Sequence, residues 1–421
     1  MNNRLLRVLN VKPFLFLWLA EIFTQIAINI LNFILIIMAF QLTRSNTAVS
    51  GIILSFTIPA IIFGVIAGVY VDRWDKRKVL LATNIIRAVL LVILAIFSNN
   101  LFLIYLFSFA ISIATQFFIP AETPIIPLLV KKDLLLSANA LFGSGIYGSV
   151  LIAYALSSPF FIFFGKIYTL SILAAFFMIA AIFINFIRVS KGNKNKSNGE
   201  SVDLTIGGEI KSLFKLLSNT KEVSGSILML TLSQVIILAI AAIGPGYANQ
   251  ILKISVEQFP LLFVTPAALG MVVGAVLLST NYFHKFLKQK LATIGVFISG
   301  FSILLLPYGS KVASKPIFTA LNKYLPNIVD INILHIMIFL AFTLGIANAL
   351  VFVPSNTILQ EETSDELRGK VYGMLNSIVG VFSLLPVIVV GGLADVIGVG
   401  KVLVGISFTL FLIGISRLVI K

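Results

Sequence analysis

The sequence predicts an all-α membrane protein with about twelve transmembrane helices, and three observations on the 421 residues lead to this fold class. First, 59% of the residues are hydrophobic and only 11% are charged, whereas about a quarter of a soluble domain is charged. Second, the apolar residues form runs of about 20, the length that crosses a hydrocarbon core ~30 Å thick. Third, short clusters of charged and turn-forming residues separate these runs.

The first expected span covers residues 13–42. Arg4, Arg7 and Lys12 precede it, as basic residues precede the apolar core of a signal peptide. The run is far longer than such a core and contains several polar residues, so we interpret it as a retained membrane helix. The other expected spans are 49–71, 79–98, 101–129, 138–164 and 167–188 in the first half, and 223–250, 258–283, 290–308, 332–359, 369–396 and 401–420 in the second.

The basic residues predict the orientation of the chain. With a cytoplasmic N terminus, the inner segments carry 23 Lys and Arg and the outer segments carry seven. Because positively charged loops stay in the cytoplasm, we expect both termini inside and the protein in a bacterial inner membrane. The net charge of +15 then faces anionic lipid head groups, and its wide spread among loops argues against nucleic-acid binding.

A polar linker divides the chain into two related halves. We expect a six-helix bundle at 1–189, a cytoplasmic linker at 190–222 and a second six-helix bundle at 223–421. The sequence FIPAET at 118–123 recurs as FVPSNT at 352–357, in the fourth helix of each half. A glycine pair recurs too, because Gly64 and Gly68 in the second helix have counterparts in Gly270 and Gly274 of the eighth.

The residue content excludes several classes of function. The chain has no cysteine, which excludes thiolate metal sites, disulfides and cysteine nucleophiles. It has only two histidines, so few side chains are available for a metal site or a Ser-His catalytic site. Gly143, Gly145 and Gly148 spell G-x-G-x-x-G, but inside an apolar span rather than after a strand. We therefore interpret these glycines as helix-packing positions, and expect neither enzymatic activity nor a cofactor.

The loop after the second span carries the strongest local motif. It reads glycine, three residues, glycine, then Asp-Arg and a basic cluster, which resembles the loop signature of the major facilitator superfamily. Asp75 departs from the signature, because many members have glycine there. The resemblance implies a fold of two six-helix repeats and a latch that holds the halves together on the cytoplasmic side. The latch residues would be Gly68, Asp72, Arg73, Arg77 and, before the eleventh span, Arg368.

Three further blocks are similar to the macrolide-efflux and enterobactin-exporter branch of this superfamily. They are residues 17–21, 117–141 and 360–373, and many members carry Gln where this chain has Glu21. The resemblance implies export of a hydrophobic or amphipathic small molecule, usually driven by protons, by a protein that works as a monomer. Its partners would be the substrate, protons and membrane lipids.

Three charged residues lie deep within the expected spans. Glu21, Arg87 and Glu122 each lie nine residues from a basic residue at the cytoplasmic end, so each sits roughly 13 Å inside the membrane. Burying a charge in a membrane costs several kcal/mol, which favours a role in transport. We expect Arg87 to pair with Glu122, leaving Glu21 to carry the proton. If Arg87 lies beside Glu21 instead, Glu122 carries it; a purely structural cluster is the remaining alternative.

Polar residues on the first helix continue from Glu21 along one face. Gln25, Asn29 and Asn32 follow at i+4, i+8 and i+11, within an arc of roughly 80°. Such a stripe either lines a water-filled cavity or bonds to another helix, and we favour the cavity. Other polar residues with a weaker claim to the cavity are Gln116, Gln234, Asn348, Asn356 and Asn376.

Proton-coupled export is the leading functional hypothesis, and two alternatives stay open. One is uptake or flipping of a nutrient or lysolipid by the same fold. The other is a non-transporting membrane scaffold or sensor. The outer segment 309–332 has no role that the sequence predicts.

Overall fold

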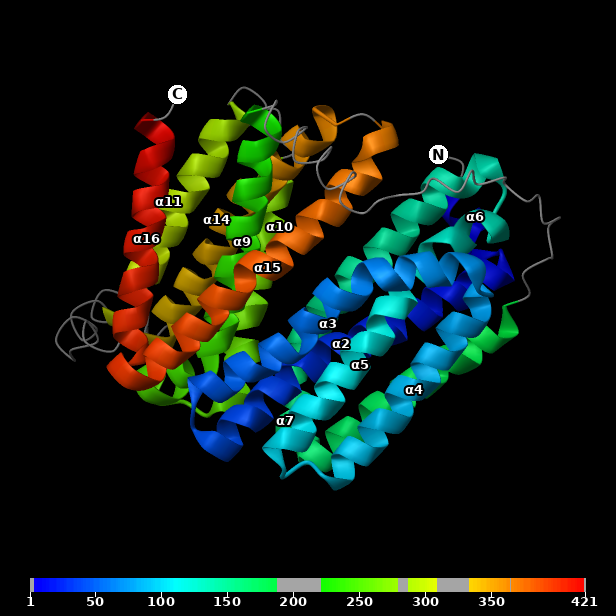
Figure 1. The fold of residues 1–421 in the computed structure, drawn as a ribbon, viewed down its shortest axis with the longest axis horizontal. Helices are drawn as coiled ribbons and strands as arrows, with labels where there is room; N and C mark the ends of the chain where they lie inside the picture. The colour runs from blue at the N-terminus through cyan, green and yellow to red at the C-terminus, as the bar shows by residue number, and fades with distance from the viewer. Residues whose placement is uncertain (1–3, 188–220, 279–286, 309–332, 364, 420–421) are drawn as a thin grey trace, which may run out of the picture. The chain divides into compact units, whose positions relative to one another are not determined.

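The computed structural model describes residues 4–187, 221–278, 287–308, 333–363 and 365–419, and all its regular elements are helices (Figure 1). Most of the predicted linker at 190–222 and the outer segment 309–332 lie outside these residues.

The chain divides into two compact units. The first comprises Met1–Leu42 and Leu54–Glu209, and the second comprises Thr43–Ile53 and Ile210–Lys421. Residues 43–53 include the start of helix α3 (Asn46–Arg73), so α3 begins in the second unit and continues in the first.

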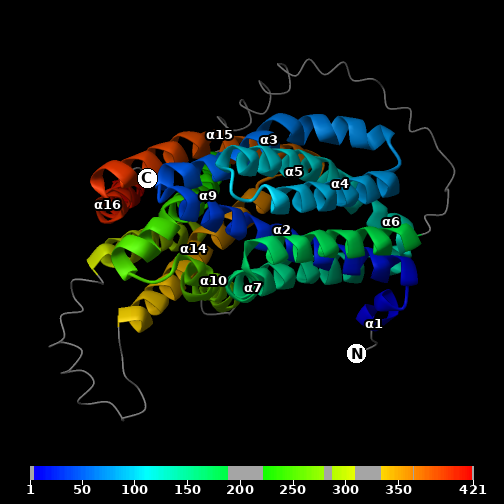
Figure 2. The same ribbon diagram turned by 90° about the horizontal axis from the view of Figure 1, so that it is seen from below.

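Long apolar helices build the first unit, and α4 lies beside both α5 and α7 (Figures 1 and 2). Short turns at Thr123–Ile125 and Lys132–Leu134 connect α5 to α7 around the four-residue helix α6. Besides α3, the helices are α1 (Arg4–Leu9), α2 (Lys12–Thr43), α4 (Lys76–Ile96), α5 (Leu101–Glu122), α6 (Ile126–Leu129) and α7 (Leu135–Phe186).

Helix α7 contains two of the predicted membrane spans. It has 52 residues, about 78 Å at 1.5 Å per residue, which is far more than one crossing needs. Gly165 interrupts it with φ 66° and ψ 176°, a conformation that L side chains rarely adopt. This break lies between the predicted spans 138–164 and 167–188. Eleven helices of the described residues are long and apolar enough to cross a membrane, and this one accounts for two predicted crossings.

The second unit contains six α-helices within the described residues. Two π-helical segments, Tyr247–Leu252 and Pro260–Val264, follow the first of them. The helices are α9 (Lys221–Gly246), α10 (Thr265–Leu278), α11 (Lys288–Leu305), α14 (Ile333–Glu361), α15 (Asp365–Ile397) and α16 (Val399–Val419).

Glycine residues let α10 and α14 pack so closely that the backbone of one helix contacts the backbone of the other. A Cβ atom added at Gly270 would lie 2.0 Å from the carbonyl oxygen of Phe342, and one at Gly345 would lie 1.9 Å from that of Ala267. Small residues at such contacts are typical of membrane helix pairs, where close packing replaces the hydrophobic effect. Gly270 belongs to the predicted glycine repeat. Its first-half counterpart is Gly64, where an added Cβ would meet only Gln116 Oε1, at 3.8 Å, and at Gly68, the counterpart of Gly274, it would meet no described atom within 4 Å.

Gly145 packs against the indole of Trp18 in the first unit. The Trp18 Nε1 atom donates a hydrogen bond of 3.0 Å to the carbonyl oxygen of Leu141, one turn before Gly145. A Cβ atom at Gly145 would lie 2.3 Å from Nε1, whereas at Gly143 or Gly148 it would meet no described atom within 4 Å. One glycine of the G-x-G-x-x-G sequence therefore serves the contact between α2 and α7.

Asp395 of α15 binds the N-terminus of α3. Its Oδ1 accepts from the backbone N–H of Asn46 at 2.7 Å, and its Oδ2 accepts from that of Thr47 at 2.9 Å. The side chains of Ser45, Asn46 and Thr47 also donate to this carboxylate, at 2.6, 2.9 and 2.7 Å. A carboxylate here satisfies backbone donors that the helix leaves free and complements the positive end of the helix dipole.

Candidate functional site

The three deep charges predicted from the sequence meet inside the first unit. Glu21 of α2, Arg87 of α4 and Glu122 of α5 are buried, with 1%, 0% and 7% of their surface exposed. Arg87 interacts electrostatically with both carboxyl groups, and the carboxyl groups of Glu21 and Glu122 lie within hydrogen-bonding reach of each other. We define these three residues as the charge cluster.

Arg87 is held mainly by aromatic rings and by its own helix. Its Cζ atom lies 4.6 Å from the ring centroid of Phe118 and 4.7 Å from that of Phe177. Its Nε donates to the carbonyl oxygen of Thr83 at 3.2 Å, and its Nη2 donates to Asn84 Oδ1 at 3.1 Å. Ring faces attract a cation, and the attraction is worth about 2 kcal/mol where water is excluded. These contacts fix the guanidinium in place.

No ion pair within 4.0 Å joins Arg87 to either carboxylate among the described residues. The Nη1 atom of Arg87 is buried and has no hydrogen-bond partner there. The direct Arg87–Glu122 ion pair that we preferred from the sequence is therefore not formed in this structure. Arg87 instead places a fixed positive charge near both acids.

Glu21 is the inner end of a hydrogen-bonded chain along α2. Gln25 Nε2 donates to Glu21 Oε1 at 2.8 Å. Asn29 Nδ2 in turn donates to the Gln25 carbonyl oxygen at 2.8 Å and to its Oε1 at 3.2 Å. Gln25 and Asn29 are half-buried, whereas Glu21 is buried. The predicted polar stripe therefore runs from a partly exposed face inward to the cluster.

Two carboxylate oxygens of the cluster are left without partners. Glu21 Oε2 and Glu122 Oε1 are both buried, and neither has a hydrogen-bond partner among the described residues. A buried acceptor without a donor is costly, and two ionised carboxylates in contact repel each other. Chemically, such an arrangement can take up a proton.

Two other polar residues of the predicted cavity are partnered within the second unit. The Ser233 hydroxyl of α9 donates to Asn348 Oδ1 of α14, and the Tyr372 hydroxyl of α15 donates to Asn356 Oδ1 of α14. Hydrogen bonds between membrane helices commonly satisfy such side chains. The other half-buried positions are Asn32, Gln116 and Gln234, and the side chain of Asn376 is not described.

Arg77 of the predicted latch contacts the end of α7. Its Nε donates to the carbonyl oxygen of Ile184 at 3.3 Å, and its Nη2 donates to the carbonyl oxygen and the Oδ1 of Asn185. A cation at the C-terminus of a helix binds carbonyl groups that lack helical partners. Arg73 is exposed, and the side chains of Asp72 and Arg368 are not described. The latch stays a prediction.

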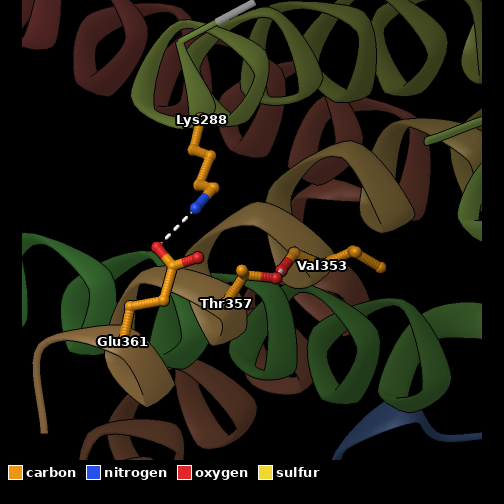
Figure 3. A network of polar contacts seen from close by, with 4 residues as sticks. All are labelled: Lys288, Val353, Thr357 and Glu361. Carbon is orange, nitrogen blue, oxygen red and sulfur yellow. Dashed lines mark hydrogen bonds and ion pairs between the residues drawn. The ribbon is translucent and has the colours of Figure 1, made fainter. Parts of the chain in front are cut away.

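An ion pair in the second unit joins the start of α11 to the end of α14. Lys288 Nζ contacts Glu361 Oε2, and Thr357, one turn earlier on α14, donates to the carbonyl oxygen of Val353 at 2.8 Å (Figure 3). The Lys288 side chain is 40% exposed and that of Glu361 is 56% exposed, so the pair contributes little to stability. Glu361 belongs to one of the sequence blocks similar to exporters.

Known proteins match almost the whole chain. The model of the Major Facilitator Superfamily matches residues 17–387. The MFS-type transporter YfiS of Bacillus subtilis is 23% identical over 403 residues, covering 92% of this chain and 88% of its own. Macrolide efflux protein A of Streptococcus pyogenes is 23% identical over 391 residues, covering 91% of this chain and 89% of its own.

Solved transporter structures share the fold. The nucleoside transporter NupG superposes with a TM-score of 0.75 at 13% identity, covering 97% of this chain and 98% of its own. A bacterial homologue of the lysosomal transporter Spinster, in an inward-facing, occupied conformation, has a TM-score of 0.68 at 12% identity, covering 96% of this chain and 95% of its own.

Proposed function

The chain belongs to the Major Facilitator Superfamily, and from this premise we propose that it exports hydrophobic or amphipathic small molecules in exchange for protons. The protein is a multi-pass membrane transporter of this family, and its chain divides into two compact units. Movement of these units would open a substrate site alternately to the two sides of the membrane.

The observation that carries proton coupling is the charge cluster. Three charged side chains share the interior of an apolar helix bundle, and three of their polar atoms have no partner among the described residues. A cluster selected for stability alone is expected to be fully paired, because each unpaired buried group costs about 1–3 kcal/mol. A cluster that gains and loses a proton is instead incompletely paired in at least one of its states.

Support for export of a drug-like compound comes from two sources. Macrolide efflux protein A is similar to this chain over most of both lengths, and the sequence blocks at 17–21, 117–141 and 360–373 resemble those of exporters. We propose that the protein works as a monomer in a bacterial inner membrane, with both termini cytoplasmic. We also propose that the latch formed by Gly68, Asp72, Arg73, Arg77 and Arg368 acts during the transport cycle.

The test uses everted membrane vesicles that hold a proton gradient reported by a fluorescent dye. Macrolides, lipophilic cations, siderophores and lysolipids are added in turn to vesicles with the wild type, Glu21→Gln or Glu361→Gln. Proton antiport predicts that one compound class collapses the gradient with the wild type and with Glu361→Gln, but not with Glu21→Gln. Glu361 is the matched control, because it is an exposed glutamate outside the cluster.

Other results would redirect the assignment. No response to any compound, with folded protein in the membrane, would contradict proton-coupled export. Accumulation of a nutrient or lysolipid in the opposite direction would establish uptake or flipping. Absence of any flux would favour a scaffold or sensor.

A further inference from the structure

The geometry of the charge cluster has room for one more proton than two ionised carboxylates carry. Glu21 and Glu122 contribute two carboxylates, and their carboxyl groups are within hydrogen-bonding reach of each other. One oxygen on each, Glu21 Oε2 and Glu122 Oε1, is buried and unpartnered. A proton on one carboxyl group would donate to the other and so replace a repulsion by a hydrogen bond.

Gln25 explains how Glu21 is oriented. Its side-chain amide binds Glu21 Oε1 at 2.8 Å, and Asn29 holds Gln25 from the next turn. Glu21 Oε1 therefore has its donor, while Oε2 is left without one. Gln25 is a positioning residue, because it acts through Glu21.

The charges around Glu21 fix the number of protons. Of the neighbouring described elements, α4 contributes Arg87 and α5 contributes Glu122, while α7 contributes the ring of Phe177. Tyr154 of α7 packs on Phe33, about three turns further along α2. With Arg87 positive, two ionised acids leave the cluster at −1, one shared proton makes it neutral, and two protons make it +1. Neutrality is the least costly state in a low-dielectric interior.

From this geometry we infer that Glu21 and Glu122 act as one acid pair that holds a single proton between them, beside the fixed charge of Arg87. On loading, the O–H of one carboxyl group donates to a carboxylate oxygen of the other. On release, the proton passes to water and both groups are carboxylates. The inference rests on the proposed function only in assigning this proton to the transport cycle; the pair itself is a property of the folded first unit.

The pair differs from both arrangements in which a single residue carries the proton. If Glu21 or Glu122 carried it alone, replacing the other would leave the titrating group in place. In an acid pair, the second carboxylate accepts a hydrogen bond from the protonated first one and adds to the effect of burial in favouring the protonated form. Replacing either glutamate therefore removes this hydrogen bond and leaves one carboxyl group beside the positive charge of Arg87, which favours the ionised form of that carboxyl group.

Infrared difference spectroscopy of the purified protein tests this directly. The spectrum is followed from about pH 6 to about pH 9, where surface carboxyl groups with an ordinary pKa near 4 stay ionised. The pair predicts that the wild type loses the carbonyl band of one protonated carboxyl group per chain as the pH rises. Glu21→Gln and Glu122→Gln each lack the band, whereas Glu361→Gln, which changes an exposed glutamate outside the cluster, keeps it.

Several outcomes would overturn the pair. One is a band that persists unchanged in Glu21→Gln or in Glu122→Gln, because the proton then belongs to the remaining residue. Another is a wild-type intensity corresponding to no proton or to two. A wild-type intensity of no proton or of two overturns the pair even if a variant does not fold.

Transport measured on the same variants separates the pair from the proposed function. If the pair acts as a unit, the double variant loses proton coupling no further than either single variant, because such effects are not additive. Predicted infrared bands without transport of any compound would reject the proposed function and keep the pair. Proton-driven transport together with a band that survives in one variant would reject the pair and keep the proposed function.

Discussion

Arg87 shows how a fully buried guanidinium is accommodated without a direct ion pair to any residue that the structure describes. Two phenylalanine rings, the Asn84 amide and the carbonyl oxygen of Thr83 surround it. Stacking on rings suits a flat, delocalised cation, which is more weakly hydrated than an ammonium group. The negative charge of the acid pair supplies the remaining compensation at longer range.

Replacing Arg87 by lysine is therefore not conservative. The ammonium keeps the charge but loses the planar contacts with Phe118 and Phe177 and the bond to Asn84, so we expect a loss of about 2 kcal/mol of unfolding free energy. Thermal unfolding of the purified protein measures this, with the exposed Arg7→Lys as control. Equal melting temperatures for Arg87→Lys and the wild type would show that the rings do not stabilise the guanidinium.

Gly145 gives a second prediction for a single residue. Gly145→Ala places a Cβ atom against Trp18 Nε1, so the indole must move and loses its bond to Leu141. We expect a destabilisation of about 1–3 kcal/mol, typical of an overpacked core. Gly148 belongs to the same motif, but an added Cβ there meets no described atom within 4 Å, so Gly148→Ala should have the same melting temperature as the wild type. Equal effects at both positions would contradict the packing role.

The sequence predicted the site residues better than their contacts. Charge inside an apolar span and a shared depth identified Glu21, Arg87 and Glu122. Which groups touch depends on side-chain rotamers and on the rings of Phe118 and Phe177, and nothing in the residue spacing indicates these. The aromatic cradle was therefore missed, because phenylalanine is abundant throughout the chain, at 36 residues.

At the scale of elements, helix ends were predicted less well than helix positions. The span predicted at 101–129 becomes α5, which ends at Glu122, a turn and the short helix α6. Pro124 and Pro127 lack the N–H groups that would continue the helix. The span predicted from residue 258 includes the π-helical segment Pro260–Val264, since apolar periodicity cannot distinguish a π turn from an α turn.

The contact of Asp395 with α3 gives a prediction at this scale. Asp395→Ala removes the acceptor for the backbone N–H groups of Asn46 and Thr47, and losing such a cap typically costs about 1 kcal/mol. Hydrogen–deuterium exchange should therefore speed up in the first turns of α3. Asp133→Ala, whose carboxylate is exposed, is the control. Unchanged protection of α3 in Asp395→Ala would show that the cap is dispensable.

At the scale of the whole molecule, hydropathy and charge were sufficient for the fold. An all-α membrane protein with two related halves follows from runs of apolar residues, the basic loops and two repeated motifs. The major facilitator type was implied by the resemblance of the loop after the second span, and the family model and solved structures confirm it. The repeat did not predict contacts equally in both halves. The glycine pair in α10 packs closely on α14, whereas Gly68 of α3 meets no described neighbour.

The orientation of the chain gives a prediction for the whole molecule. Because the chain lacks cysteine, single cysteines at Asn10 and Asn99 can be labelled individually. Both positions are exposed, and the excess of basic residues places Asn10 inside and Asn99 outside. In intact cells a membrane-impermeant maleimide should label Asn99→Cys and not Asn10→Cys. The reverse pattern would invert the proposed topology.

Proton release on substrate binding tests the central claim most directly. A compound that collapses the gradient in vesicles is added to purified protein in weakly buffered detergent with a pH indicator. The wild type should release one proton for each molecule bound, and Glu21→Gln and Glu122→Gln none. Binding without proton release by the wild type, or release that persists in either variant, would contradict a proton-sharing pair at the centre of transport.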